Sequence, residues 1–302
     1  FLNPKIKMSK MGEFQELGAI DGLQISSVSA DLYGDGRDDL SLFFFEQGAN
    51  FAAVYTSSSI VSASINWNLR LKRHFIKALF VNTKNANTFT GEKGLLGLKE
   101  ISKALSKALT LKAAQTPGGI HDTIKYNEIL FASTGVIGEE FPTQKIKNNL
   151  NFLVKKLRTV QSKYVWFKTA SAIMTTDTRP KLAYEECKIG NKIIKLSGIA
   201  KGSGMIAPNM GTMLSYIFIE ANITSSILNK LLQKNIIDSF NSISVDGDMS
   251  TNDTVMVFAT GNTKFGSIGK NTQAFKSISI SLKKVMISLA QQIVCDGEGI
   301  SK

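Results

Sequence analysis

Short apolar runs separated by turn residues dominate the first half of the chain. Residues 40–45 and 51–55 are largely apolar and predict strands. The segment Gly34-Asp35-Gly36 is a turn signal that precedes the first of these strands. Residues 77–82 and 129–132 predict two more buried strands, each followed by a polar loop.

Segments with helical spacing are mixed with these strands and do not alternate strictly with them. Residues 94–112 and 146–163 predict helices, the second from the spacing of Leu150, Leu153 and Leu157. Residues 275–294 predict a final helix, and Gly190-Asn191 predicts a hairpin turn. Strands are also expected at 170–174 and 255–260, whereas periodicity leaves 212–221 open between strand and helix.

The mixture of strands and helices favours an α+β layered fold over a doubly wound parallel sheet. The chain has 302 residues, enough for one large domain or two intimately packed ones. Hydrophobic residues make up 43% and charged residues 20%, which is typical of a globular enzyme. No apolar run approaches the roughly 20 residues of a membrane span, so we expect no membrane partner. No signal peptide is recognised, and the first residue is Phe1 rather than Met, which indicates a fragment or a processed product.

Cysteine and histidine are scarce, which excludes several chemistries. The two cysteines, Cys187 and Cys295, form no paired motif, so a reducing cytoplasm is expected. The two histidines, His74 and His121, lie in no metal-ligand pattern, and any catalytic triad would have to use one of them. The sequence therefore predicts no metal site of this kind.

Two other functions are weighed and disfavoured. The formal net charge of +12 is spread through the chain without a nucleic-acid-binding fingerprint, so solvated helix faces explain it better than a nucleic-acid partner. The acidic loops at 31–39 and 246–250 resemble calcium-binding loops. The second lacks Gly at its sixth position and Glu at its twelfth, and a turn explains both loops better.

The segment at 201–214, Lys-Gly-Ser-Gly-Met-Ile-Ala-Pro-Asn-Met-Gly-Thr-Met-Leu, carries the most specific chemistry. Its glycines permit tight backbone geometry before Thr212. A small residue such as Gly211 leaves its carbonyl open to attack by the Thr212 hydroxyl, so the bond between them suits self-cleavage. Cleavage would free an α-amine whose ordinary pKa of about 7.7–8.0 lets it act as a base toward its own hydroxyl. Taken alone, Gly-Thr is more often a plain turn that enters a core strand.

This string closely resembles the self-cleavage motif of the ornithine acetyltransferase family, also called glutamate N-acetyltransferases, with Gly211 where Ala is usual. Further segments resemble family motifs and occur in family order. These are 133–138 (Ser-Thr-Gly-Val-Ile-Gly), 175–178 (Thr-Thr-Asp-Thr), 245–254 (Val-Asp-Gly-Asp-Met-Ser-Thr-Asn-Asp-Thr) and 296–299 (Asp-Gly-Glu-Gly). The resemblance covers essentially the whole chain.

The resemblance implies a reaction and assigns its residues. Thr212 would take the acetyl group of N2-acetylornithine as an ester and pass it to glutamate. Thr134, through its hydroxyl, and Gly135, through its N–H, would stabilise the oxyanion, a contribution of about 3–4 kcal/mol per donor. The implied substrate contacts are Thr175, Lys201, Thr212 and Glu298. No metal or organic cofactor is implied, and acetyl-CoA is a second donor that some family members accept.

The resemblance also implies an architecture, which is a layered αββα-type arrangement of sheets flanked by helices, of the self-processing N-terminal-nucleophile kind. Cleavage would leave an α chain, 1–211, and a β chain, 212–302, that stay associated, typically as a heterotetramer. Family members continue beyond the end of this sequence, so an inactive truncated relative is one alternative. A self-processing aminopeptidase or amidase of the same fold is another. Lys84 stands where the family has a glycine, at a position where a positive φ is expected.

Overall fold

The computed structural model describes residues 14–115, 123–204, 213–244, 250–261, 268–269 and 272–297. Its helices are α1 Ala63–Leu71, α2 Gly91–Gln115, α3 Thr143–Lys155, α4 Lys163–Ala172, α5 Ser225–Ile236 and α6 Gln273–Cys295. Its strands are β1 Leu23–Val28, β2 Leu40–Tyr55, β3 Phe75–Asn82, β4 Ile129–Ser133, β5 Lys181–Ile189, β6 Lys192–Lys201, β7 Leu214–Ile219 and β8 Thr254–Ala259.

The strands form one sheet in the order β4-β3-β2-β8-β7-β6-β5, with β1 paired to β2 outside this path. β2 holds the sheet together. Its first half pairs with β1 and β3, whereas its second half pairs with β8. The register with β3 shifts between Phe44 and Ala49, where Gly48 has a φ of 81°. This irregularity lets one strand serve two halves of the sheet.

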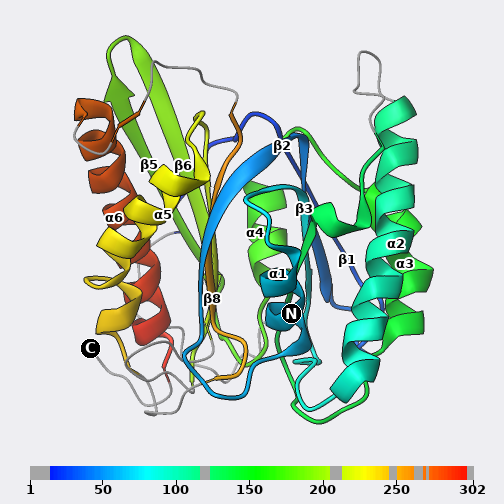
Figure 1. Cartoon of the computed structure of the whole chain (residues 1–302). Coiled ribbons are helices and arrows are strands. Elements are labelled where there is room, and N and C mark those ends of the chain that lie inside the picture. The colour runs from blue at the N-terminus through cyan, green and yellow to red at the C-terminus, as the bar shows by residue number, and fades with distance from the viewer. Residues whose placement is uncertain are drawn as a thin grey trace.

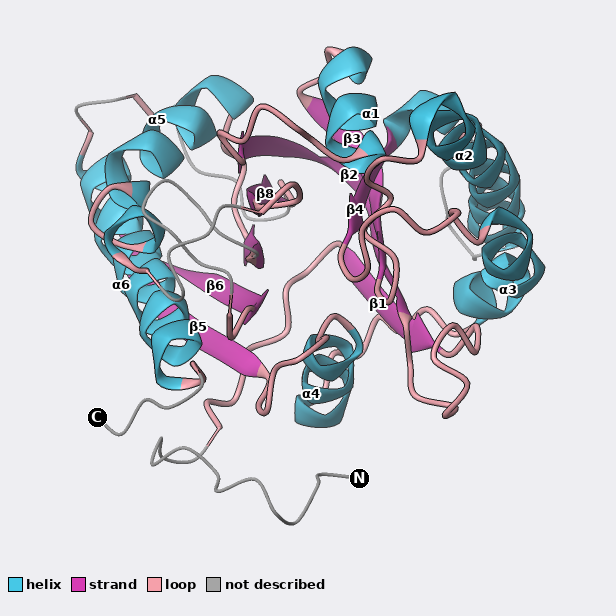
Figure 2. Cartoon of the chain, turned by 90° about the horizontal axis from the view of Figure 1, so that it is seen from below, coloured by secondary structure: helices cyan, strands magenta, loops and turns pink. Residues whose placement is uncertain are grey.

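The two halves face each other across a shared apolar core. Phe43 of β2 stacks on Phe218 of β7 with ring centroids 5.1 Å apart, and Trp166 of α4 closes the same cluster. The outer faces are covered by helices, with α1, α2 and α3 over β1–β4, and α5 and α6 over β5–β8 (Figures 1 and 2). The predicted layered α+β fold with flanking helices is therefore confirmed, with the two sheet layers continuous through β2.

Several helices begin at a polar residue whose side chain caps the first turn. Ser62, Ser162, Thr224 and Thr272 each accept a hydrogen bond from the backbone N–H three residues later. Such caps satisfy backbone donors that have no partner inside the helix. The caps at Ser62 and Thr224 begin α1 and α5, two helices that periodicity alone did not predict.

The sequence predictions differ from the structure in several places, and the strands expected at 40–45 and 51–55 are one strand, β2. The strand expected at 170–174 is wrong, because residues up to Ala172 belong to α4, which begins after Ser162 and buries Trp166 and Ala170 one turn apart. The helix expected at 146–163 ends at Lys155. Finally, α6 is by length and composition apolar enough to cross a membrane, although half of its most apolar window is buried, and it packs on β5 and β6.

Candidate active site

Several strand ends meet at one end of the sheet, the lower end in Figure 1. Because β3 and β4 are parallel, Asn82 and Ser133 end side by side. β6 runs antiparallel to β7, so Lys201 at the end of β6 pairs with Leu214 at the start of β7. Leu214 in turn lies beside Thr254, which begins β8. The loops that leave or enter these strands carry the family-like motifs.

A cavity of about 400 Å³ opens among these loops. Thr134, Gly135, Thr175 and Lys201 all line it, although they come from separate parts of the chain. The other predicted site residues, Gly211, Thr212 and Glu298, lie outside the described residues. The complete lining is Tyr33, Lys84, Ala86, Thr134, Gly135, Val136, Ile137, Thr175, Thr176, Lys201, Gly204, Ser250, Thr251 and Asn252.

Lys201 is a buried cation in the cavity wall, and its side chain is 2% exposed. Its Nζ donates hydrogen bonds to Oγ1 of Thr175 at 2.7 Å and to Oγ1 of Thr134 at 3.4 Å. Burial lowers the pKa of Lys201, while the nearby Asp177 carboxylate opposes that shift. Because Lys201 donates to both hydroxyl oxygens, the hydroxyl hydrogens of Thr134 and Thr175 remain free to donate elsewhere.

Asp177 is the buried counter-charge beneath this lysine, and sequence reasoning assigned it no role. Its carboxylate lies 3.8 Å from Lys201 and 2.6 Å from Lys181, and it accepts a 2.6 Å hydrogen bond from the Gly202 N–H. Burial alone would raise the pKa of Asp177, but the two ammonium groups outweigh burial and lower the pKa to about 2. Lys181 also pairs with Asp296, which fastens the end of α6 to the site.

The backbone at Gly135 tolerates only glycine. Its φ is 134°, and a Cβ atom placed there would lie 2.1 Å from the backbone carbon of Lys84. Two backbone hydrogen bonds fix the loop that faces Gly135. The Val136 N–H donates to the Lys84 carbonyl, and the Ala86 N–H donates to the Val136 carbonyl. Lys84 itself has a φ of 72°, so the expected positive φ at this position is confirmed.

Asn252 joins the motif at 245–254 to the segment 133–138 and to the loop after β3. Its amide nitrogen donates to the carbonyls of Ala86 and Ser133, each at 2.7 Å, and its oxygen accepts from Thr88 at 3.1 Å. All of these groups are buried. The sequence motif marked the segment, but no spacing rule indicated that Asn252 would bridge β4 and the loop after β3.

Asp253 anchors the residue that follows Thr212 in the chain. Its Oδ1 accepts a 2.8 Å hydrogen bond from the Met213 N–H, and its own carbonyl accepts from Thr56. Burial raises the pKa of Asp253 to about 8, although the Met213 N–H bond and the Lys201 charge act in the opposite direction. At neutral pH this carboxyl is therefore largely protonated.

The acidic loop at 31–39 is organised as a turn. Asp39 is fully buried, and its carboxylate accepts 2.7 Å hydrogen bonds from the N–H groups of Ala30 and Leu32. Asx-type bonding of this kind closes loops without an ion. Among the described residues, no three His, Cys, Asp or Glu side chains come close enough to hold a metal ion. Most of the second acidic loop, 246–250, lies outside the described residues.

Comparisons with known proteins identify relatives of this chain. The chain resembles the arginine biosynthesis bifunctional protein ArgJ of Bartonella henselae, with 40% identity over 287 residues, which is 94% of this chain and 66% of that protein. The chain thus spans just under two thirds of that relative's length. The crystal structure of ArgJ from Bacillus halodurans matches with a TM-score of 0.55 and 26% identity, covering 66% of this chain and 97% of that one.

A more distant likeness concerns the fold alone. The L-aminopeptidase D-Ala-esterase/amidase of Ochrobactrum anthropi, described as a variant of the Ntn-hydrolase fold, aligns over 94% of this chain and 89% of its own, with a TM-score of 0.52 and 8% identity. This likeness supports the expected N-terminal-nucleophile architecture. The model of the ArgJ family matches residues 24–302, nearly the whole sequence. The chain therefore belongs to the ArgJ family.

Proposed function

We propose that this chain is an acetyltransferase of arginine biosynthesis, which cuts itself between Gly211 and Thr212 and moves the acetyl group of N2-acetylornithine to glutamate through an acetyl-Thr212 ester. One observation carries the proposal. Thr134, Gly135, Thr175 and Lys201, taken from three separate motifs, line a single cavity. The N–H of the residue next to Thr212 is held at this end of the sheet by Asp253.

The chemistry follows from the groups available. The Thr212 hydroxyl oxygen attacks the acetyl carbonyl while the α-amine of Thr212 takes the hydroxyl proton. The oxyanion accepts hydrogen bonds from the Thr134 hydroxyl and the Gly135 N–H. Collapse of the tetrahedral intermediate breaks the acetyl–nitrogen bond, and the departing amine of ornithine receives the proton. The glutamate amine then attacks the ester by the same steps in reverse, which frees the Thr212 hydroxyl.

Lys201 serves this scheme in two ways. Its hydrogen bond to Thr134 leaves the hydroxyl hydrogen of Thr134 to point toward the oxyanion. Its positive charge, buried at the cavity wall, attracts the carboxylate of an amino-acid substrate. Thr175 and Glu298 complete the proposed substrate contacts, with Glu298 facing the ammonium group. We include acetyl-CoA as a second donor to be tested, and the scheme uses no other cofactor.

Sheet pairing supports continued association of the proposed α chain, 1–211, and β chain, 212–302. β7 and β8 would belong to the β chain, yet they lie between β6 and β2 of the α chain. α6, from the β chain, packs on β5 and β6. Separation would therefore expose the apolar core on both sides of β7 and β8. We propose a heterotetramer of two such pairs in the cytoplasm.

A trapping experiment tests the reaction. The protein is mixed with N-acetylornithine, quenched in acid and digested, and the peptide that begins with Thr212 is weighed. We expect an added acetyl group that disappears when glutamate is supplied, with N-acetylglutamate formed. The same experiment with acetyl-CoA tests the second donor. The Thr212→Ala variant should carry no acetyl group.

The likeness to the Ochrobactrum anthropi enzyme makes a hydrolase the second candidate. A hydrolase would pass the acyl group to water, so acetate would form in the absence of glutamate. Absence of any acetyl-peptide, together with cleavage of amino-acid amides, would replace the proposed transferase with this aminopeptidase.

A further inference from the structure

A second cavity, of about 410 Å³, lies between β1, α3 and α4, and no residue lines both this cavity and the candidate active site. We propose that it is a binding site for a small organic carboxylate with an apolar body. Its lining includes Ser26, Phe152, Lys156, Arg158 and Lys168. A cavity of this volume is typical of small-molecule sites.

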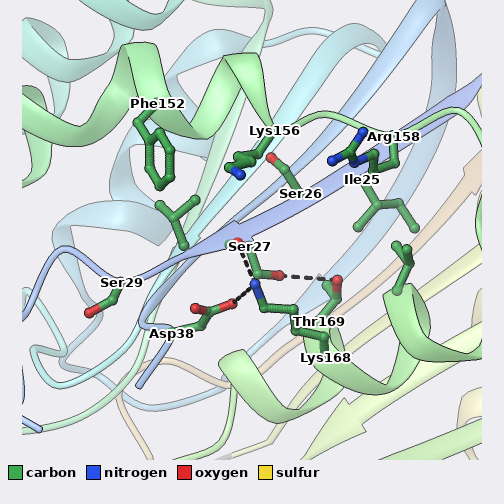
Figure 3. A pocket seen from close by; sticks show the side chains of 12 residues that line it. Ile25, Ser26, Ser27, Ser29, Asp38, Phe152, Lys156, Arg158, Lys168 and Thr169 are labelled. Carbon is green, nitrogen blue, oxygen red and sulfur yellow. Dashed lines mark hydrogen bonds and ion pairs between the residues drawn. The ribbon is translucent and has the colours of Figure 1, made fainter. Parts of the chain in front are cut away.

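The charge of the lining favours an anion. Lys168 is neutralised by Asp38, whose carboxylate lies 3.0 Å from its Nζ. Lys156 and Arg158 have no carboxylate within ion-pair distance among the described residues. Figure 3 shows these two cations on either side of Ser26, with the Asp38–Lys168 pair below them. Within the described part of the chain, two positive charges without an ion-pair partner therefore line one cavity.

Ser26 supplies an independent observation. Its side chain lines the cavity and is 3% exposed, yet its hydroxyl has no hydrogen-bond partner in the described part of the chain. A buried hydroxyl without a partner costs free energy, so such a group calls for an explanation. A ligand oxygen between Lys156 and Arg158 would receive this hydroxyl hydrogen.

The exposed edge of β1 adds a backbone donor. Ile25 exchanges two backbone hydrogen bonds with Arg158, at 3.0 and 3.1 Å, which fixes the position of Arg158. Because strand residues alternate, the next residue whose backbone faces this edge is Ser27. Its carbonyl accepts from Lys168 Nζ at 3.4 Å, and its N–H lies on the same edge of the strand.

Part of the wall is apolar, which favours an organic carboxylate over a bare inorganic anion. Phe152 is 48% exposed and lines the cavity together with Val165 and Val28. An aromatic or branched ligand body would cover the exposed ring of Phe152 while its carboxylate reaches Arg158. Phenylacetate has this combination of groups and serves as the probe.

Calorimetric titration of the purified full chain with phenylacetate tests the proposal. Arg158→Gln should weaken binding at least about tenfold, because it removes a charge-assisted contact. Lys156→Gln should weaken binding several-fold. Lys155→Gln, the matched control at the last residue of α3, should leave affinity unchanged, because Lys155 does not line the cavity. The three positions are exposed, so these variants should fold normally.

Ser26→Ala provides a second readout. The variant should bind phenylacetate more weakly, while the free protein should be equally stable or more stable in urea, because an unpaired buried hydroxyl has been removed. Four results would overturn the proposal: no binding to the wild-type chain, equal affinity in the Arg158→Gln variant, tighter binding of phenylacetamide than of phenylacetate, or binding of inorganic phosphate but not phenylacetate. Equal affinity would place the probe elsewhere, for example beside Lys201.

Discussion

Replacing Asp177 with Asn should test the buried charge cluster beneath the candidate active site. The carboxylate only accepts hydrogen bonds, and its contacts are two ammonium groups and the N–H groups of Thr175 and Gly202. An amide has the same shape but carries no charge, and its nitrogen is a donor that would face other donors. Lys201 would then be left buried without its nearest anion.

The expected cost can be worked out from this geometry. The Asp177 side chain is 0% exposed, and removing one partner of a buried ion pair typically costs about 3–5 kcal/mol. Lys181 retains Asp296, which places the expected loss at the lower end of that range, about 3 kcal/mol. The matched control is Asp238→Asn, which breaks a 2.7 Å pair with Lys283 on the surface, where the carboxylate is 60% exposed. Surface pairs of this kind contribute about 0–1 kcal/mol.

The assay is equilibrium unfolding in urea at pH 7, with both substitutions made in a Thr212→Ala background so that the chain stays uncut. Relative to the Thr212→Ala parent, the free energy of unfolding should fall by at least about 3 kcal/mol for Asp177→Asn. For the control it should fall by less than about 1 kcal/mol. A loss below 1 kcal/mol for Asp177→Asn would refute the conclusion that this carboxylate is the main counter-charge of the two lysines.

Three further predictions concern the walls of the site. Gly135→Ala should cost more than about 3 kcal/mol and abolish acetyl transfer, because the new Cβ meets the Lys84 backbone. Gly190→Ala, at an open hairpin turn, should cost only about 1 kcal/mol. Asn252→Ala should cost about 2–4 kcal/mol in urea, since two buried carbonyls lose their donor. We expect the stability of the parent chain to fall as the pH rises from about 4 to 8, with a slope of up to about 1.4 kcal/mol per pH unit, and Asp253→Asn should remove this loss.

The sign of the last prediction follows from proton binding. The folded chain keeps the Asp253 proton up to a pKa of about 8, whereas the unfolded chain releases it near the ordinary value of 3.8. Between these values the unfolded state binds fewer protons, so rising pH favours unfolding. Equal slopes in the parent and the Asp253→Asn variant would contradict the raised pKa. Full stability of Gly135→Ala, or of Asn252→Ala, would contradict the contacts on which those predictions rest.

Local signals in the sequence were sufficient for much of the fold. The Gly190-Asn191 hairpin and the helix spacing of 94–112 follow from turn chemistry and periodicity, and the structure contains both. The continuity of β2 could not be predicted in this way. Residues 46–48 interrupt its apolar pattern as a turn would. The segments on either side nevertheless form one strand, whose pairing with β3 and β8 could not be predicted from local pattern. The strand wrongly expected at 170–174 shows that a short apolar run does not distinguish a strand from the end of a helix.

A site residue could be predicted where it lies in a recognised motif with an assigned role. It could not be predicted where its role depends on residues that are distant in the chain. Thr134 and Lys201 were assigned by resemblance, and the structure brings them to one cavity. Asp177 lay inside a recognised motif, yet its role depends on Lys201 and on a lysine that also contacts Asp296, 115 residues further along the chain. Such contacts arise from tertiary packing, which leaves no fixed spacing in the sequence.

The central claim is that Thr212 becomes the first residue of a new chain and acts as the nucleophile. The most direct test is a denaturing intact-mass spectrum of the purified protein beside its Thr212→Ala variant. We expect two masses that meet between Gly211 and Thr212 for the parent protein, and one uncut mass for the variant. A single uncut mass in both samples, or a cut at another bond that survives in the variant, would contradict the account.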